Sequence, residues 1–531
     1  MLAYLIAIYI VCGVYMLLNF KYDIQMLQQN SYRISRYYRW LEKGDYYSAS
    51  RLVDLALLML LFSTLMTPAQ AALVIAVTFI VKIFYILRRK YKKPLVFTRR
   101  VWRIYSVSGV LAAAAFITAA TVPAINAPQA SDSAVKALVT ILLISMFSWA
   151  IVIAAVWLLT PVEKSINRKY YNEAASILRS MPGLQIVGIT GSYGKTSTKH
   201  YLNRILSESY EVLMTPGSYN TPMGVIRTVR EMMKPYHQVF ICEMGAKQTG
   251  DIKEICDLVH PSMGIITAVG PMHLETFKTI DNVCATKFEL ADALPADGLL
   301  AVNNDFEPSA AREVHNVKTM RYGVSNPEGC DFRAVDVCYS PKGTTFTVEG
   351  SDGLRLGLET RLVGECNIAN LLGAIVIALR LGVPHERIRY AVAAIEQVEH
   401  RLNIKQTPGG VTIIDDAFNS NPSGSKMAVD VLSHFTDGKR IIVTPGMIEL
   451  GEEQHELNKE LGRYMGDKVD VAVIVGEYNR DALSSGIRST DFDTANLHEV
   501  GSFAEAQQLL SRILRRGDTV LYENDLPDTF K

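Results

Sequence analysis

The sequence lacks the features of a nucleic-acid-binding protein and those of a disulfide-bonded one. Its formal net charge is only +1 over 531 residues, and no long basic field runs along it. Lys and Arg gather instead beside apolar segments, unlike the basic patches that bind a phosphate backbone. The seven cysteines include no Cys-x-x-Cys pair, which argues against a disulfide framework and a zinc site. We therefore expect no nucleic-acid partner, and a reducing environment for the polar part of the chain.

Acidic residues are scarce in the first third of the chain, where apolar residues dominate. The apolar runs cover residues 2–20, 52–66, 71–87, 105–125 and 134–159. A helix needs roughly 20 apolar residues to cross a bilayer, and a cleaved signal peptide would explain only the first run. We expect a membrane domain over residues 1–161 with about five transmembrane helices, in which the short second run forms a tight hairpin with the third.

The basic residues between these runs predict an orientation. Residues 21–51 and 88–103 are rich in Lys and Arg, whereas residues 67–70 and 126–133 are nearly free of them. Because basic loops stay on the cytoplasmic side, we expect a multi-pass protein of the cell membrane, with its N-terminus outside and its polar domains in the cytoplasm. Asp54 lies inside the second run, where an ionisable residue often marks function. Its position near a helix end fits a structural role equally well.

A phosphate-binding loop is predicted after a linker helix at residues 162–183. A strand-length apolar run, residues 184–190, leads into Gly-Ser-Tyr-Gly-Lys-Thr-Ser-Thr at 191–198, and a helical pattern follows. Strand, glycine-rich loop and helix form the context that such a loop requires. Backbone N–H groups would attract the phosphates, Lys195 would reach the terminal ones, and Thr196 could ligate Mg²⁺. The alternative is an ordinary strand-to-helix turn, since Gly-x-x-Gly-Lys-Thr is shorter than the usual spacing.

Strand candidates alternate with helical stretches through the rest of the chain, which predicts α/β domains with parallel sheets. We place a central domain at residues 184–401 and a C-terminal domain at residues 402–531. Residues 332–362 alternate apolar and polar and suggest a small β appendage. The further strand candidates are residues 238–242, 263–269, 299–302, 411–414, 440–443, 471–475 and 520–522.

Acidic and histidine side chains follow several of the central strands. Glu243 follows one strand, His273 and Glu275 follow the next, and Lys287 and Glu289 lie beyond them. A lone residue of this kind is usually a solvated surface residue. Because the ligands of open α/β sheets gather at the carboxyl edge of the strands, several such residues beside a phosphate loop favour a metal site.

Taken together, these motifs resemble the Mur ligases, the ATP-dependent amino-acid ligases of peptidoglycan synthesis, and within them the subgroup that adds D-alanyl-D-alanine. The resemblance implies an α/β fold with a P-loop central domain and a Rossmann-like C-terminal domain, and these follow the helical transmembrane N-terminal domain that the apolar runs predict. It runs in family order from residue 184 to the C-terminus. The matching stretches are residues 190–198, 218–224, 243–245, 273–275, 287–289, 303–305, 364–370, 400–402, 415–422 and 446–451.

The resemblance also implies roles for individual residues. Thr196 and Glu243 would bind one Mg²⁺, and His273 with a carbamylated Lys287 would bind a second. ATP would phosphorylate a carboxylate, and an amine would then displace phosphate from the acyl phosphate. The implied catalytic residues are Lys195, Lys287, His273 and Arg401. The implied ATP-binding residues are Gly191, Ser192, Gly194, Lys195, Thr196 and Ser197 at the phosphates, Asn367 and Asn370 near adenine, Arg401 at the γ-phosphate and Asp416 at the ribose.

Two departures from the family pattern leave the substrates open. Membrane segments occupy the place of the domain that grips a UDP-sugar in the family, and residues 521–528 differ from the Lys-Gly-Ser-Arg type of turn usual in the subgroup. Our leading expectation is a cell-wall precursor as acceptor, either a UDP-linked or a lipid-linked muropeptide, and an amino acid or dipeptide as the amine. Membrane helices would bring the enzyme to a lipid-linked acceptor or would serve only as an anchor.

Three other functions compete with this interpretation. A membrane-bound amide ligase outside peptidoglycan synthesis, similar to poly-γ-glutamate synthase, is the main alternative, although residues 415–422 look like the D-alanyl-D-alanine-adding subgroup. A transport ATPase would require repeats across the helices and an acidic pair at a strand end in a motor context, and neither is evident. An inactive scaffold is disfavoured because Lys195, Glu243, His273 and Lys287 are all present.

Overall fold

The computed structural model divides the chain into two compact units. A helical unit ends at Ile166, and an α/β unit begins at Asn167. The structure describes residues 2–30, 32–42, 49–62, 67–89, 91, 94–121, 130–272, 274–340, 343–398, 401–417 and 421–525.

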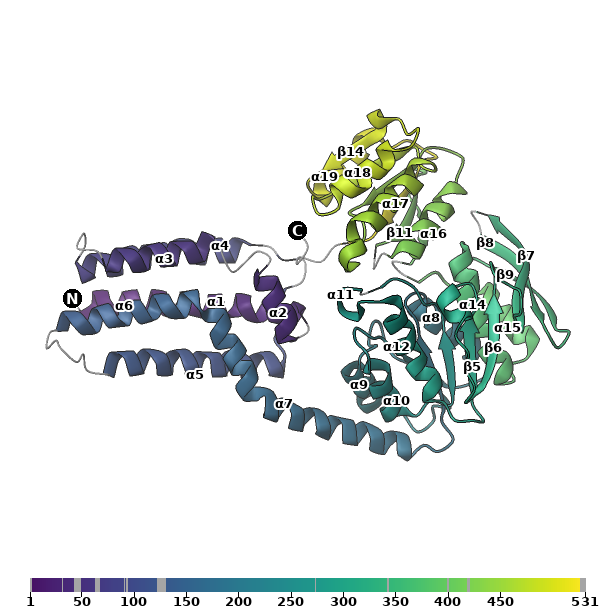
Figure 1. Ribbon diagram of the computed structural model, residues 1–531, viewed down its shortest axis with the longest axis horizontal. Helices are drawn as coiled ribbons and strands as arrows, with labels where there is room; N and C mark the ends of the chain where they lie inside the picture. Colours follow the sequence, from purple (N-terminus) through teal and green to yellow (C-terminus); the bar gives the residue numbers. More distant parts are fainter. Residues whose placement is uncertain are drawn as a thin grey trace. The chain divides into compact units, whose positions relative to one another are not determined.

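The helical unit consists of helices that run side by side (Figure 1). Large apolar side chains such as Val77, Val81 and Phe84 on one helix are exposed, as expected for a surface that faces lipid. Four helices of the described part are long and apolar enough to cross a membrane: Ala7–Gln29, Ala69–Arg88, Arg99–Thr118 and Ser148–Arg179. The helices are α1 (Leu2–Gln29), α2 (Ile34–Trp40), α3 (Ala49–Leu61), α4 (Pro68–Arg88), α5 (Arg99–Thr121), α6 (Ala130–Met146) and α7 (Ser148–Arg179), and α7 continues into the α/β unit.

Two of the five expected spans differ from the prediction. The second run forms α3, which has only 13 residues; it lies in one apolar cluster with α4, through Leu57 and Ile75, while residues 63–66 of the expected hairpin lie outside the described residues. The run at 134–159 is not one helix, because α6 ends at Met146 and α7 begins at Ser148. Parts of the two loops used for the orientation, residues 122–129 and Lys90, Lys92 and Lys93, also lie outside the described residues.

The helix break between α6 and α7 is held by a buried polar network. Asn19 of α1 donates from Nδ2 to the carbonyl of Ser145, at 3.0 Å, and to Ser148 Oγ, at 3.1 Å. The Asn19 amide thus binds a carbonyl that an unbroken helix uses for its own hydrogen bond to the N–H four residues later. Ser145 donates to Asp54 at 2.6 Å, and Ser148 donates to Asp23 at 2.5 Å.

The first part of the α/β unit contains a nine-stranded sheet in the order β2-β3-β1-β4-β5-β6-β7-β8-β9. Strands β2 to β7 pair in parallel, and β7, β8 and β9 pair antiparallel. The strand candidates at 238–242, 263–269 and 299–302 are confirmed as β3, β4 and β5. The strands are β1 (Gln185–Thr190), β2 (Val212–Met214), β3 (Val239–Glu243), β4 (Met263–Ile266), β5 (Leu299–Asn303), β6 (Lys318–Gly323), β7 (Phe332–Ser340), β8 (Gly343–Gly350) and β9 (Arg355–Thr360).

The appendage expected at residues 332–362 is not separate from this sheet. Strand β7 pairs with β6 through Tyr322–Phe332 and Gly323–Arg333, so β7, β8 and β9 extend the central sheet. The alternating pattern of these strands predicted β structure correctly, but it carries no information about which edge they join. The helices of this part are α8 (Lys195–Leu206), α9 (Pro222–Met232), α10 (Asp251–Val259), α11 (Leu274–Phe277), α12 (Ile280–Asp292), α13 (Glu307–Ala310), α14 (Glu365–Arg380) and α15 (His385–Ala393).

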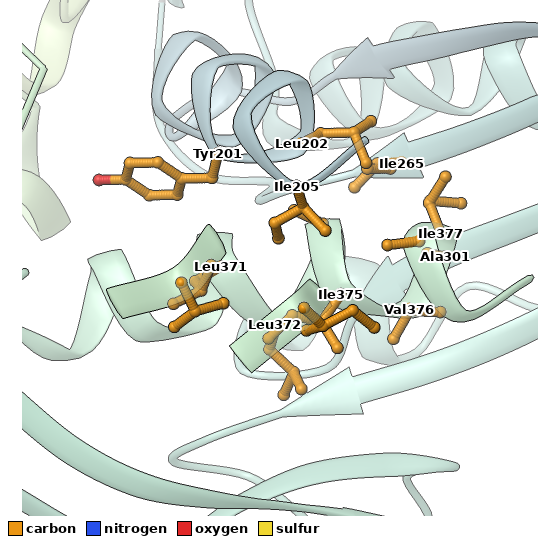
Figure 2. Close-up of a cluster of buried hydrophobic side chains, with 14 of the residues drawn as sticks. Tyr201, Leu202, Ile205, Ile265, Ala301, Leu371, Leu372, Ile375, Val376 and Ile377 are labelled. Carbon is orange, nitrogen blue, oxygen red and sulfur yellow. The ribbon is translucent and has the colours of Figure 1, made fainter. Parts of the chain in front are cut away.

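The helix that follows the phosphate loop is fixed by a buried apolar cluster. Figure 2 shows Leu202 and Ile205 of α8 in one cluster with Leu372 and Ile375 of α14, and all four side chains are buried. Burial of each such side chain contributes about 1.5–3 kcal/mol. A second buried cluster is formed by other side chains of the sheet and includes Leu178 of α7. The packing of α8 therefore places the start of that helix at the carboxyl end of β1.

The second part of the α/β unit has a six-stranded sheet in the order β10-β11-β15-β12-β13-β14. All its pairings are parallel except that of β10 with β11. The four strand candidates of the C-terminal domain are confirmed as β11, β12, β13 and β15. The elements are β10 (Asn403–Gln406), β11 (Thr412–Asp416), α16 (Pro422–Ser433), β12 (Arg440–Thr444), α17 (Gln454–Gly466), β13 (Val471–Val475), α18 (Arg480–Arg488), β14 (Leu497–Val500), α19 (Phe503–Ile513) and β15 (Thr519–Glu523).

Candidate nucleotide and metal site

The glycine-rich loop lies between the end of β1 at Thr190 and the start of α8 at Lys195. Gly191 and Gly194 have φ values of 151° and 78°, which side chains rarely tolerate. A Cβ on Gly191 would lie 2.2 Å from Thr267 Oγ1, and a Cβ on Gly194 would lie 2.1 Å from Asn370 Oδ1. Both glycines are therefore required by the close approach of the loop to its neighbours.

Lys195 bends back over this loop. Its Nζ donates to the carbonyls of Gly191, at 2.7 Å, and Ser192, at 3.2 Å. Burial lowers the pKa of Lys195 to about 8, although Glu243 acts in the opposite direction. An ammonium held by uncharged carbonyls in a buried place favours an anionic partner, and this is the position where a phosphate-binding lysine is needed.

Two serines of the predicted loop support it rather than face outward. Ser192 Oγ donates to the carbonyl of Gly270 at 3.0 Å and accepts from the N–H of Gly270 at 3.2 Å, so this hydroxyl ties the loop to the segment after β4. Ser197 is buried on α8. We therefore expect Ser192 and Ser197 to contact phosphate through their backbone N–H groups, which suit anion binding at a helix start.

Glu243 is the carboxylate at the centre of the site. It ends β3 and is 1% exposed. Its Oε1 accepts from Thr196 Oγ1 at 3.2 Å and from Asn220 Nδ2 at 3.1 Å, and its Oε2 lies 2.8 Å from Lys199 Nζ. Burial raises the pKa of Glu243, but Lys199 and Lys195 lower it by more, so it lies below the ordinary value. Glu243 is therefore ionised at neutral pH.

The Thr196–Glu243 pair fits a magnesium ion. Octahedral Mg²⁺ holds its oxygen ligands at 2.0–2.1 Å, so two neighbouring ligands lie roughly 3 Å apart. The 3.2 Å between Thr196 Oγ1 and Glu243 Oε1 matches that spacing. Within the described ranges no three His, Cys, Asp or Glu side chains come together as a metal cage. Mg²⁺ itself commonly takes one or two protein oxygens and completes its shell with phosphate and water.

Lys287 is a second buried amine, on α12. It is 2% exposed, and burial together with Lys195 lowers its pKa to about 7. A large fraction of this amine is thus neutral near pH 7, which is the form that reacts with CO₂. Glu289 has another role than ligation: its carboxylate accepts from the N–H groups of Gly250, at 2.7 Å, and Lys253, at 2.9 Å, at the start of α10. His273 and the side chain of Glu275 lie outside the described residues.

The two asparagines of α14 lie beside the phosphate loop. Asn370 contacts Gly194, as the clash distance above indicates. Asn367 accepts at Oδ1 from the hydroxyl of Tyr201, at 2.8 Å, and donates from Nδ2 to the carbonyl of Val363, at 2.9 Å. Asn367 therefore joins α8 to α14, and an adenine contact for either asparagine stays a prediction.

Arg401 and Asp416 influence each other and face the same region. Burial lowers the pKa of Arg401, while Asp416 and Glu243 act to raise it. Burial raises the pKa of Asp416 to about 7, opposed by Arg401. Asp416 also accepts from the N–H of Leu402 at 3.2 Å. The structure thus brings Lys195, Glu243 and Arg401 within electrostatic reach of one another.

The sequence interpretation missed two residues of the site, Lys199 and Asn220. Both contact the Glu243 carboxylate. Lys199 comes four residues after Lys195, which places both on one face of α8, and this spacing is the signal that could have identified it. Asn220 belongs to one of the stretches matched to the family, but only its distance from Glu243 shows what it does.

Comparisons with known proteins agree with the geometry. A family model for the Mur ligase middle domain matches residues 189–378, and one for the Mur ligase glutamate ligase domain matches residues 400–522. The UDP-N-acetylmuramoyl-tripeptide–D-alanyl-D-alanine ligase of Bacillus subtilis is 27% identical over 346 residues, 64% of this chain and 73% of that protein. The enzyme of the same name from Mycobacterium tuberculosis is 30% identical over 367 residues, 64% of this chain and 70% of that protein.

Solved structures give the same picture. A crystal structure of MurF from Acinetobacter baumannii is 27% identical with a TM-score of 0.62, over 68% of this chain and 77% of that one. The MurF ligase of Thermotoga maritima in complex with ADP is 25% identical with a TM-score of 0.60, over 68% of this chain and 80% of that one.

Proposed function

This chain belongs to the Mur ligase family of ATP-dependent, ADP-forming ligases, and from that premise we propose that it joins D-alanyl-D-alanine, or a similar amino acid or dipeptide, to the peptide carboxylate of a peptidoglycan precursor. The observation that carries the proposal is the phosphate loop with Thr196 and Glu243 3.2 Å apart beside it. The relatives that share both domains are named for this reaction. Fold alone would not carry a substrate.

In the proposed reaction a carboxylate oxygen of the acceptor attacks the γ-phosphorus of ATP, and ADP leaves. The amine then attacks the acyl carbon, phosphate leaves, and the amine gives up one proton. Lys195 binds the β- and γ-phosphates, and Arg401 reaches the γ-phosphate. Thr196 and Glu243 would hold a Mg²⁺ ion, which would offset charge on the transferring phosphoryl group. Asp416 would bind the ribose, and Asn367 together with Asn370, which lies beside Gly194 of the loop, would lie near the adenine.

A carbamylated Lys287 is part of this proposal. An ammonium beside a metal would repel it, whereas a carbamate is an anionic oxygen ligand. The buried amine with its pKa lowered to about 7 supports the modification, because a neutral amine is needed to take up CO₂. Together with His273, the carbamate would hold the second Mg²⁺.

In one form of the proposal the acceptor is lipid-linked, and the helical unit then brings the ligase to its substrate. An enzyme confined to a bilayer meets a lipid-linked substrate at a raised effective concentration. Basic residues at headgroup level attract anionic groups with about 1 kcal/mol each. Some of the described arginines have other partners: Arg103 pairs with Glu163 at 2.7 Å, and Arg100 lies over the Tyr32 ring at 4.1 Å. The competing view is that the helices only anchor an enzyme that uses the UDP-linked precursor.

The buried carboxylate of Glu523 supports a second candidate function. Strand β15 ends in Glu523, which is 1% exposed and accepts from Ser425 Oγ at 2.8 Å and Thr444 Oγ1 at 2.5 Å. A buried carboxylate stands where the subgroup that adds D-alanyl-D-alanine usually carries a basic turn, which favours a different amine. The alternative is a membrane-bound amide ligase outside peptidoglycan synthesis.

The deciding experiment incubates the purified full-length protein with ATP, UDP-linked and lipid-linked muropeptides and a panel of amines, and identifies products by mass. The proposal expects an adduct with D-alanyl-D-alanine or a related amine, formed with ADP and absent in the Lys195→Ala variant. A product from a non-muropeptide carboxylate alone would favour the second function. Equal turnover of both acceptors by the full protein and by a truncation that starts near Val162 would show that the helices are only an anchor.

A further inference from the structure

Lys199 of α8 is a buried lysine that the proposed reaction has not yet used. It lies one helical turn after Lys195, and its side chain is 0% exposed. Burying an ammonium is costly unless it is paired and hydrogen-bonded. A buried lysine at this position therefore needs a counter-charge and hydrogen-bond acceptors around its ammonium group.

The two partners of Lys199 belong to different segments. Its Nζ lies 2.8 Å from Glu243 Oε2, at the end of β3, and donates to the carbonyl of Gly217 at 2.7 Å. Gly217 belongs to the loop between β2 and α9. The same loop donates to the other oxygen of Glu243 through Asn220 Nδ2, at 3.1 Å, and accepts from the N–H of Gly245 at the Asn220 carbonyl, at 2.7 Å. One ammonium thus joins the phosphate-loop helix, the carboxylate and this loop.

These contacts decide which oxygen of Glu243 meets a metal. Oε2 lies in the ion pair with Lys199, while Oε1 faces Thr196 and Asn220. A carboxylate held this way offers one oxygen to Mg²⁺ and cannot turn to bind through both. Without Lys199, the carboxylate could rotate, and the spacing of 3.2 Å between Thr196 Oγ1 and Glu243 Oε1 would no longer be fixed.

We propose that Lys199 is a positioning residue, which holds the Glu243 carboxylate with Oε1 towards Thr196 and anchors the loop at Gly217, so that the Mg²⁺ site is formed before nucleotide arrives. The inference rests on the proposed metal role of Thr196 and Glu243. Lys199 itself touches neither nucleotide nor metal. Partners behind metal ligands commonly change metal affinity by 10–100-fold when removed.

The test measures ADP binding by calorimetry with the full-length protein in detergent, once with Mg²⁺ and once with EDTA. The ratio of the two affinities reports the metal site without any acceptor, so the result stands even where the acceptor assignment fails. We expect Lys199→Met to reduce this ratio by about tenfold or more, with ADP affinity in EDTA close to that of the wild type. Binding of Mn²⁺ with ADP, followed by electron paramagnetic resonance, should weaken in parallel.

Lys253→Met is the matched control, because Lys253 pairs with Asp257 at the same 2.8 Å but its side chain is 65% exposed. It should leave the ratio unchanged. Lys199→Gln is a second variant that keeps a hydrogen-bond donor towards Gly217 and removes only the charge. A wild-type ratio in a folded Lys199→Met or Lys199→Gln protein would overturn the proposal. Loss of the folded state in both variants would overturn it too, since Lys199 would then serve folding rather than orientation.

Discussion

At the scale of single residues, burial sets the protonation of the amines around the nucleotide site. Lys195 and Lys287 are both pushed towards the neutral form, with pKa values lowered to about 8 and about 7. Burial is the largest cause in each case, and Lys195 adds repulsion at Lys287. An arriving triphosphate would further favour the charged form of Lys195, whereas a carbamate would replace the charge on Lys287 by the opposite one.

Substitution of Lys195 should abolish activity while the protein stays folded. Lys195→Ala removes the ammonium that lies over the loop carbonyls, and we expect ligation and ATP consumption to fall by roughly 100-fold or more. Circular dichroism should stay as in the wild type, because the side chain contributes to no apolar cluster. The exposed Lys253→Ala variant is the control. Turnover close to wild type in Lys195→Ala would contradict the assignment of this loop as the nucleotide site.

Substitution of Lys287 should be reversible by added carboxylate. Lys287→Ala is expected to lose activity, and acetate or another short carboxylic acid should restore part of it by replacing the carbamate. In the wild type, carbamylation at a fixed CO₂ concentration should rise with pH through about 7, because the lowered pKa makes the amine neutral above that pH. Native mass spectrometry across this pH range measures the modification. Carbamylation would be refuted if short carboxylic acids failed to rescue Lys287→Ala and the wild type carried no added mass.

At the scale of elements, the break between α6 and α7 shows what a sequence pattern leaves out. Residues 134–159 contain no glycine or proline that would end a helix, so the pattern indicated one span. The break depends on Asn19, which is 126 residues away from Ser145. Strands such as β1, β3 and β13 were predictable because their apolar runs depend only on local composition. Lys199 was missed for the same reason as the break, since its partners are distant in sequence.

The ion pair between Lys82 and Asp54, part of the buried polar network, should have a strong effect on the free energy of unfolding. Lys82 Nζ lies 2.5 Å from Asp54 Oδ1, and the two side chains are 11% and 1% exposed. Asp54→Asn leaves the lysine buried without its counter-charge, so we expect a loss of about 3–5 kcal/mol. The double variant Asp54→Asn with Lys82→Met should recover much of this loss.

Thermal unfolding in detergent measures the effect, with the exposed Glu42→Gln as control. An Asp54→Asn variant as stable as the wild type but impaired in ligation would instead indicate a functional role for Asp54.

At the scale of the whole molecule, the orientation of the helical unit is open to a direct measurement. With the basic segments 88–103 in the cytoplasm, a cysteine at Ser131 should react with a membrane-impermeant reagent added to intact cells, and one at Lys92 should not. Lys92 should become reactive once the cells are opened, which controls for its accessibility. The reverse pattern would place the ATP site outside the cell, where ATP is scarce, and would overturn the proposed topology.

Helix α7 is the last helix of the helical unit and the first element of the α/β unit. On the proposed topology this order has a consequence for synthesis. The ribosome completes α1 to α6 before it adds the first residue of β1, and it reaches Lys195 later still. Each nascent chain is then already in the bilayer when its ATP site is translated. On that topology, insertion of the helical unit into the bilayer would precede the formation of active enzyme.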